Sequence, residues 1–168
     1  MKEPLLEIKD ERLSFFTPAG EVKALNGVSF SMEEGEVLGI VGESGSGKSV
    51  TAYSIMGLTA YPGKLIGGTI RFNGHQIDKM TEKEFRHLRG NEVSIIFQDP
   101  MTSLNPVYTI GNQIVEVILL HTDKTRAEAK ARAKELLELV GINEPEKRLK
   151  QYPHELSGGM RQRVMIAI

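Results

Sequence analysis

The chain contains no cysteine and no tryptophan among its 168 residues, and its charges nearly cancel. The absence of cysteine excludes disulfides, cysteine-bound zinc, iron–sulfur clusters and thiol nucleophiles from these residues. A formal net charge of −1, from 21 basic and 22 acidic residues, argues against binding nucleic acid or an anionic membrane through bulk charge. The apolar runs are far too short for a membrane span, and the N-terminus lacks the apolar core of a signal peptide. We therefore expect a soluble, cytosolic chain.

Alternating apolar residues and turn sequences indicate that the first part of the chain is rich in strands. The turn sequence Thr17-Pro18-Ala19-Gly20 separates two such segments, which we expect to pair antiparallel. Asn73-Gly74 is typical of a tight turn, and Ile77 should continue that hairpin on the other side. Two short apolar runs indicate further strands, the later one buried on both faces. The expected strands span 5–16, 22–32, 36–41, 67–72 and 93–97.

Capping sequences and a 3.6-residue apolar period indicate helices between and after these strands. Thr81 with Glu84, and Thr125 with Glu128, have the spacing of a capping box, in which each side chain accepts a hydrogen bond from the other residue's amide. Gly141 stands where the second of these helices should end. The expected helices span 48–57, 82–89, 110–120 and 125–140.

A glycine-rich segment between an expected strand and an expected helix matches the pattern GxxxxGK[ST]. The amides of such a loop converge on phosphate groups, and the positive end of the following helix points to the same place. Lys48 would bridge the β- and γ-phosphates, and the Ser49 hydroxyl would bind Mg²⁺. A plain glycine-rich turn is the simpler alternative, and kinases, GTPases, helicases and transport ATPases all share the motif. The motif consists of Gly42, Glu43, Ser44, Gly45, Ser46, Gly47, Lys48 and Ser49.

Two further motifs follow the loop in the sequence. Phe97-Gln98-Asp99-Pro100 comes directly after the last apolar run, and the Gln98 side chain offers an oxygen to Mg²⁺ and an amide to a water molecule. Ser157-Gly158-Gly159 opens a helix whose free amides, dipole and serine hydroxyl form a second anion site. Taken alone, Gln98 is a polar residue at a strand end and Ser157 is an ordinary N-cap.

Three stretches that contain these motifs resemble one family. VGESGSGKSV, FQDPMTSLNPVYTIGNQI and YPHELSGGMRQRVMIAI are similar to the ATP-binding subunits of ABC transporters, in the branch that serves oligopeptide, dipeptide and nickel importers. The resemblance implies an α/β P-loop NTPase with a RecA-like core, an N-terminal antiparallel β portion and an inserted helical subdomain. The implied division is 1–98 for the nucleotide-binding core, 99–155 for the helical subdomain, and 156–168 for the signature motif and the start of its helix.

The resemblance also assigns roles within the motifs. Gln98 lies in the Q-loop, as a catalytic and metal-binding residue beside the catalytic Lys48, and Val50 extends the nucleotide contacts of the phosphate loop. By the same resemblance, one segment binds the γ-phosphate of an ATP held by an opposite subunit, so that two ATPs lie between two head-to-tail subunits. That segment is Ser157, Gly158 and Gly159.

Other assignments leave alternatives. By resemblance an aromatic residue after the first strand stacks on adenine. Phe15 and Phe16 are the two candidates, and Phe15 is favoured, with Phe16 as the open alternative. Asp99 would become the leading metal ligand if the family resemblance failed. His154 is interpreted as structural or contact-forming, because the family's catalytic histidine lies much later in the sequence than the signature motif.

The function implied by the resemblance is ATP hydrolysis coupled to uptake of oligopeptides or dipeptides, with nickel as the alternative cargo. The implied cofactors are ATP and Mg²⁺. The implied partners are a second ABC ATPase subunit, identical or different, two transmembrane permease subunits that dock near 99–125, and indirectly an extracytoplasmic peptide-binding protein, with no nucleic acid. The chain would be peripheral, at the cytoplasmic face of the cell membrane. The alternatives are a non-transport ABC ATPase acting on DNA and a binding-only fragment.

Some elements of the family pattern have no match in the sequence. No Asp-Glu pair follows four apolar residues, and the later switch histidine is not present. These groups complete Mg²⁺ binding and activate the attacking water in the family. We therefore expect an N-terminal fragment of a longer ATPase, with a truncated version of the fold. Alone, it should not hydrolyse ATP, and it should tend to self-associate through an exposed sheet edge.

Overall fold

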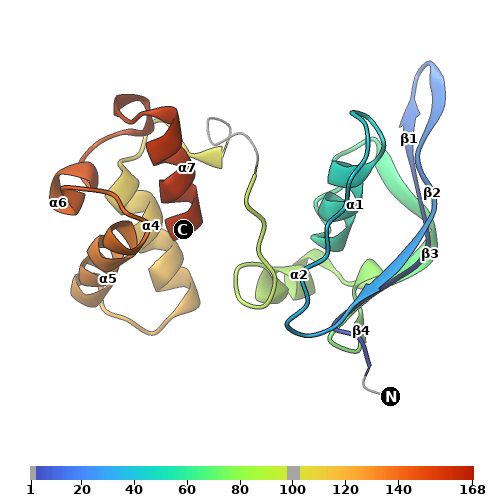
Figure 1. Cartoon of the computed structure of the whole chain (residues 1–168), viewed down its shortest axis with the longest axis horizontal. Coiled ribbons are helices and arrows are strands. Elements are labelled where there is room, and N and C mark those ends of the chain that lie inside the picture. The colour runs from blue at the N-terminus through green and yellow to red at the C-terminus, as the bar shows by residue number, and fades with distance from the viewer. Residues whose placement is uncertain (1–2, 98–102) are drawn as a thin grey trace. The chain divides into compact units, whose positions relative to one another are not determined.

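The structure is a computed structural model that describes residues 3–97 and 103–168. The chain divides into two compact units, Met1–Ser94 and Ile95–Ile168 (Figure 1). The first unit contains the sheet and the glycine-rich loop, and the second contains the helices that follow. Gln98 and Asp99, both singled out in the sequence, lie outside the described residues.

A four-stranded antiparallel sheet in the order β2-β1-β3-β4 forms the first unit (Figure 1). The predicted hairpin of the first two strands is confirmed, and its register closes at Thr17 opposite Gly20. Asn73 and Gly74 have φ angles of 48° and 77° and connect the last two strands, as the tight turn requires. The strands are β1 (Leu6–Thr17), β2 (Gly20–Met32), β3 (Gly63–Phe72) and β4 (His75–Gln76).

Ile77 does not continue the β4 strand as the sequence predicted. It begins a short 3₁₀ helix, Ile77–Lys79, and its side chain is fully buried. The Asp78 carboxylate accepts a hydrogen bond from the Ile70 amide at 2.8 Å, so a side chain replaces the strand pairing at this point. The chain then turns toward α2 (Glu82–Leu88), whose predicted capping box is confirmed.

The two short apolar runs predicted as strands do not form strands. In the part of the chain that the structure describes, residues 36–41 pair with no strand, and Val37 and Val41 are 96% and 93% exposed. Val93 makes one isolated parallel bridge with Arg89, and Ile96 is 55% exposed rather than buried. Both predictions are wrong for this structure. An apolar run becomes a strand only where neighbouring strands take its backbone hydrogen bonds, and the sheet described here offers it none.

The second unit is helical, and its predicted helices are confirmed. Thr125 and Glu128 form the predicted capping box of α5. Gly141 ends that helix with φ 72°, and its amide donates to the Glu138 carbonyl at 2.9 Å. The apolar core includes the fully buried Ile110 and Leu137. The elements are α4 (Ile110–His121), α5 (Arg126–Leu139), α6 (Pro145–Arg148), a 3₁₀ turn (Pro153–Glu155) and α7 (Gly158–Ala167). Within residues 3–97 and 103–168, every helix is too short or too polar to cross a membrane.

A bulge in β1 buries a carboxylate. Leu6 and Ile8 face the core, but Asp10 has φ 48° and the register slips by one residue against both neighbouring strands. The slip turns Glu11 and Leu13 inward, and both side chains are 0% exposed. Neither Glu11 carboxyl oxygen has a hydrogen-bond partner. Burial raises the pKa of this carboxyl, and the nearby Ser54 hydroxyl opposes that rise.

Replacing Glu11 is expected to stabilise the fold, and more so at higher pH. The raised pKa makes the folded chain hold its proton where the unfolded chain has lost it, so the carboxyl lowers stability as pH rises above the ordinary glutamate pKa of about 4.3. Glu11→Leu should raise the free energy of unfolding by about 1 to 3 kcal/mol near neutral pH. Urea unfolding curves at several pH values measure this gain, which should shrink toward acidic pH.

The control is Glu92→Leu, which changes an exposed carboxyl of the same unit. It should move the free energy of unfolding by less than about 0.5 kcal/mol. A Glu11→Leu gain that is absent, or that does not grow with pH, would contradict the argument.

Candidate nucleotide-binding site

The glycine-rich loop leads directly into α1 (Lys48–Ile55), and Gly47 is the residue where the two meet. Gly47 has φ 94°, a left-handed conformation that other residues rarely adopt. A Cβ at this position would lie 2.6 Å from Leu25 Cδ2 and 3.1 Å from the Ala24 carbonyl oxygen. The glycine therefore lets α1 begin in direct contact with β2.

The N-terminus of α1 is available to an anion. No side chain caps it, and its first turn contains no acidic residue. The first amides of a helix have no partner inside the helix, and the helix dipole places partial positive charge beside them. The amides concerned belong to Lys48, Ser49 and Val50. Together with the loop amides, they provide donors of the kind that phosphate groups require.

Lys48 lies over the loop that precedes it. Its ammonium group donates to the Gly42 carbonyl at 2.8 Å and to the Glu43 carbonyl at 2.6 Å, and it approaches Ser46 Oγ at 3.4 Å. The same side chain is thus held against the carbonyls of the loop. The structure brings the loop residues and the lysine together as the sequence predicted, while their contacts with nucleotide remain a prediction.

Few groups are available to hold a metal ion. In the described residues, no cluster of three or more histidine, aspartate or glutamate side chains is placed to bind one. The exposed Ser49 hydroxyl lies in the first turn of α1, next to Lys48. One hydroxyl beside a phosphate site fits Mg²⁺, which usually keeps several waters and takes few protein ligands.

The two candidate adenine partners have different surroundings. Phe15 is half-buried in β1, and its ring edge lies close to Gly63. Phe16 is 44% exposed, and the Lys64 ammonium lies 5.9 Å from its ring centroid. The difference in burial agrees with strand alternation. Which ring stacks on adenine stays a prediction.

A second helix N-terminus carries the Ser157-Gly158-Gly159 sequence in the other unit. Ser157 is the N-cap of α7, and its hydroxyl accepts from the Met160 amide at 3.3 Å. Gly158 and Gly159 are exposed, and a Cβ on Gly159 would meet no atom within 4 Å. The buried Leu156 side chain anchors the lead-in to the helix. These first-turn amides are accessible to an anion.

The surroundings of this helix include contacts that the sequence did not reveal. The Arg161 guanidinium donates to the Leu156 carbonyl at 3.1 Å. The Gln162 amide donates to the Phe97 carbonyl at 3.4 Å, so α7 contacts the residue that precedes Gln98. His154 stacks on Tyr152 with ring centroids 5.7 Å apart, in line with a contact-forming role. No local sequence signal identifies Gln162, because its partner is a backbone atom distant in sequence.

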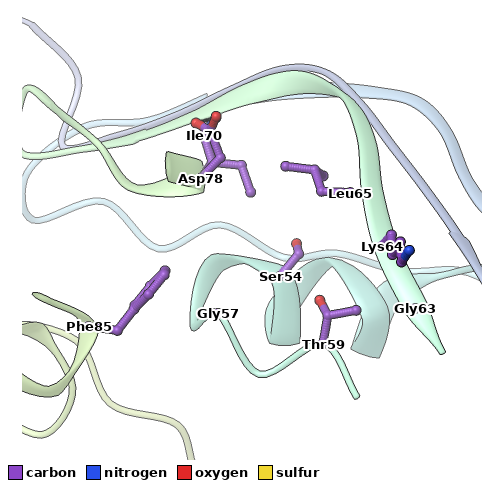
Figure 2. A pocket seen from close by; sticks show the side chains of 9 residues that line it. All are labelled: Ser54, Gly57, Thr59, Gly63, Lys64, Leu65, Ile70, Asp78 and Phe85. Carbon is purple, nitrogen blue, oxygen red and sulfur yellow. Dashed lines mark hydrogen bonds between the residues drawn. The ribbon is translucent and has the colours of Figure 1, made fainter. Parts of the chain in front are cut away.

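A pocket of about 130 Å³ lies between the end of α1 and strand β3 (Figure 2). It is separate from the glycine-rich loop, since no loop residue lines it. Its lining consists of Ser54, Gly57, Thr59, Gly63, Lys64, Leu65, Ile70, Asp78 and Phe85.

The loop, the helix that it opens and the lysine at their junction define a P-loop nucleotide-binding protein. Residues 25–168 match the family model for ABC transporters. The chain belongs to this family, whose ATPase cassettes have the α/β fold expected from the sequence, and nucleotide binding is the family's shared property. The predicted family and fold class are confirmed.

Known relatives and structures agree with this assignment. The chain is 53% identical over 166 residues, 99% of its length, to the oligopeptide transport ATP-binding protein OppD of Escherichia coli. It is 56% identical over 165 residues, 98% of its length, to OppD of Bacillus subtilis. The dimeric structure of MJ0796, a bacterial ABC transporter cassette, matches with a TM-score of 0.83 and 26% identity, over 96% of this chain and 67% of that one. The chain spans about half the length of the curated relatives, 49% and 46% respectively.

The contact of Gly47 with β2 can be tested against a second glycine of the same loop. Gly45 also has a left-handed φ of 82°, but a Cβ there would meet nothing within 4 Å. Gly45→Ala should therefore cost only conformational strain, about 1 to 2 kcal/mol. Gly47→Ala should cost about 1 to 3 kcal/mol more, because Leu25 and the backbone of Ala24 must move. Urea unfolding curves of the two variants give both values, and equal losses would contradict a steric role for this contact.

Proposed function

We propose that this chain is the ATP-binding part of an ABC importer that takes up oligopeptides or dipeptides. The observation that carries the proposal is the 53% identity to the oligopeptide transport protein OppD of Escherichia coli across 99% of the chain. The same stretch includes the glycine-rich loop, the Gln98 segment and the signature sequence. The activity of the whole protein, its substrates and its partners are all part of this proposal.

In the proposed site, the loop amides and the first turn of α1 bind the phosphates of ATP. Lys48 moves from the Gly42 and Glu43 carbonyls to the β- and γ-phosphates, since phosphate oxygens are stronger acceptors for its charge. The Ser49 hydroxyl and the Gln98 side chain would hold Mg²⁺, which would supply positive charge to neutralise the phosphates of ATP. Phe15 stacks on the adenine ring.

The second anion site is proposed to act between two subunits. Ser157, Gly158 and Gly159 present their amides to the γ-phosphate of an ATP on an opposite ABC subunit. The dimer reported for the MJ0796 cassette supports this arrangement. In the proposed division of labour, 1–98 binds nucleotide, 99–155 contacts the transporter, and 156–168 contacts the second subunit's ATP.

The remaining partners follow from the proposed transport role. Two membrane-embedded permease subunits contact the helical part around 99–125, and an extracytoplasmic peptide-binding protein supplies the cargo to them. The chain lies at the cytoplasmic face of the membrane as a peripheral subunit. The transported peptide itself does not contact this chain.

Binding of Mg-ATP to the chain is the first test of this function. Lys48→Ala removes a charged donor to phosphate and should weaken binding by more than about tenfold, measured by titration calorimetry. Lys79→Ala is the matched control, because it removes the same charge from an exposed position of the same unit. It should leave the affinity unchanged. A folded wild-type chain that binds no Mg-ATP would overturn the nucleotide assignment for these residues.

The importer role is tested in cells that express the chain's own gene and need an imported peptide to grow. The Lys48→Ala allele should abolish peptide-dependent growth, whereas Lys79→Ala should not. Normal peptide uptake with lost nickel uptake would favour nickel as the cargo. Normal uptake of both would overturn the importer proposal.

The adenine partner is tested with two neighbouring variants. Phe15→Ala should weaken ATP binding by about 1 to 3 kcal/mol, the usual contribution of one aromatic–base stack. Phe16→Ala should have little effect, because its exposed ring contacts Lys64 instead. Titration calorimetry of the two variants measures both affinities. A larger loss of ATP affinity for Phe16→Ala than for Phe15→Ala would assign the adenine contact to Phe16.

A further inference from the structure

The C-terminal end of α1 is held by one arginine from another element. Arg89 follows α2, and its guanidinium donates to the Met56 carbonyl at 2.7 Å and to the Gly57 carbonyl at 2.9 Å. The same group forms an ion pair with Glu82 at 2.8 Å and lies 4.8 Å from the centroid of the Phe85 ring. The Arg89 side chain is 21% exposed. One planar group therefore ties the end of α1 to α2 in several directions.

These carbonyls are the ones that the helix end leaves free. Gly57 has φ 60°, and its amide donates to the Ser54 carbonyl at 3.0 Å. The Leu58 amide donates to the Tyr53 carbonyl at 2.8 Å, which completes a Schellman motif. The carbonyls of Met56 and Gly57 lie beyond that motif. A cation beside them also interacts favourably with the negative end of the helix dipole.

A pocket leaves part of the space beside this end of α1 unfilled, although Ile55 packs on the apolar core of the unit and Met56 is buried. Figure 2 shows the pocket between α1 and β3, with Phe85 on the side of Gly57. A Cβ on Gly57 would lie 2.6 Å from the Phe85 ring, so helix end and ring are already in close contact. The helix end thus contacts α2 and Arg89 through Gly57, in addition to the core packing of Ile55 against the sheet.

A displaced helix end would also displace the phosphate loop. The helix is eight residues long, which corresponds to about 12 Å. Lys48 is its first residue, and Gly47 fixes it against Leu25 of β2. A helix this short moves as one body, so its direction depends on the contacts at its two ends.

We propose that Arg89 is a positioning residue for the nucleotide site: by holding the Met56 and Gly57 carbonyls, it sets the direction in which α1 presents its amides and Lys48 to phosphate. This inference rests on the proposed function, in which that loop binds ATP. Arg89 touches neither the loop nor the phosphates in this role. It acts through the helix.

The test is Mg-ATP affinity of Arg89 variants, measured by calorimetry at a temperature where circular dichroism shows each variant fully folded. Arg89→Ala should weaken binding by about tenfold, in the range of coupling between distant sites. Arg89→Lys should give an intermediate loss, because an ammonium group lacks the planar fork that reaches both carbonyls. A purely structural role would lower the melting temperature and leave the affinity of the folded variants unchanged.

Two control variants isolate the carbonyl contacts. Arg86→Ala removes an arginine of α2 whose side chain is 78% exposed. Its Nε lies 3.9 Å from Glu82 Oε1. Glu82→Gln removes the carboxylate partner of Arg89 and leaves its bonds to the two carbonyls. Both variants should bind Mg-ATP like the wild type.

Hydrogen exchange of the loop amides provides a readout that does not depend on ATP. Arg89→Ala should speed exchange over residues 42–50 relative to wild type and Arg86→Ala, and leave exchange in β1 unchanged. Wild-type affinity in Arg89→Ala together with unchanged loop exchange would overturn the inference. If the wild-type chain binds no ATP, the proposed function fails, and the exchange result alone decides whether Arg89 positions the loop.

Discussion

The contact between Gly47 and β2 determines where helix α1 begins, and the phosphate loop depends on that starting point. A side chain at this position would overlap Leu25 Cδ2, at 2.6 Å, and the left-handed φ of 94° is one that residues other than glycine rarely adopt. Because Lys48 follows directly, the same contact places the ammonium group and the first free amides of the helix. The loop geometry is therefore a consequence of backbone packing against the sheet, and the lysine contributes charge to a site whose shape is already defined.

The two helix N-termini of the chain are built for different ligand contacts. The first turn of α1 has no side-chain cap and carries Lys48, so its amides and a full positive charge are both available to phosphate. At α7, the Ser157 hydroxyl already accepts from the Met160 amide, and the nearby Arg161 donates to the Leu156 carbonyl. The Arg161 guanidinium lies beside the exposed amides of Gly158 and Gly159, 4.0 Å from where a Cβ on Gly158 would be. The α7 site therefore differs from the α1 site in its side-chain cap, since one of its first-turn amides is already bonded to Ser157.

Local rules predicted the local elements, and the errors concern contacts between distant residues. Both capping boxes, the Asn73-Gly74 turn and the loop before α1 depend on residues within a few positions of each other, and all form as expected. The runs 36–41 and 93–97 needed neighbouring strands, which no local pattern specifies, and neither forms a strand. The bulge at Asp10 reverses the alternation of β1 and buries Glu11, whereas a regular continuation from Leu6 and Ile8 would have exposed it. Arg89 was not singled out because its partners are backbone carbonyls.

The way α1 is attached explains why contacts at its ends matter so much. A typical surface helix is held by a broad apolar stripe, which tolerates small changes in helix direction. The buried residues of α1 are instead Thr51 and Ser54, whose hydroxyls donate to the Gly47 and Thr51 carbonyls of the helix itself. These bonds satisfy the helix internally, and its apolar attachment to the sheet core comes from Ile55. The Gly47 contact at one end and the Arg89 carbonyl bonds at the other add to the packing of Ile55, and directional contacts of this kind fix an angle more narrowly than apolar packing does.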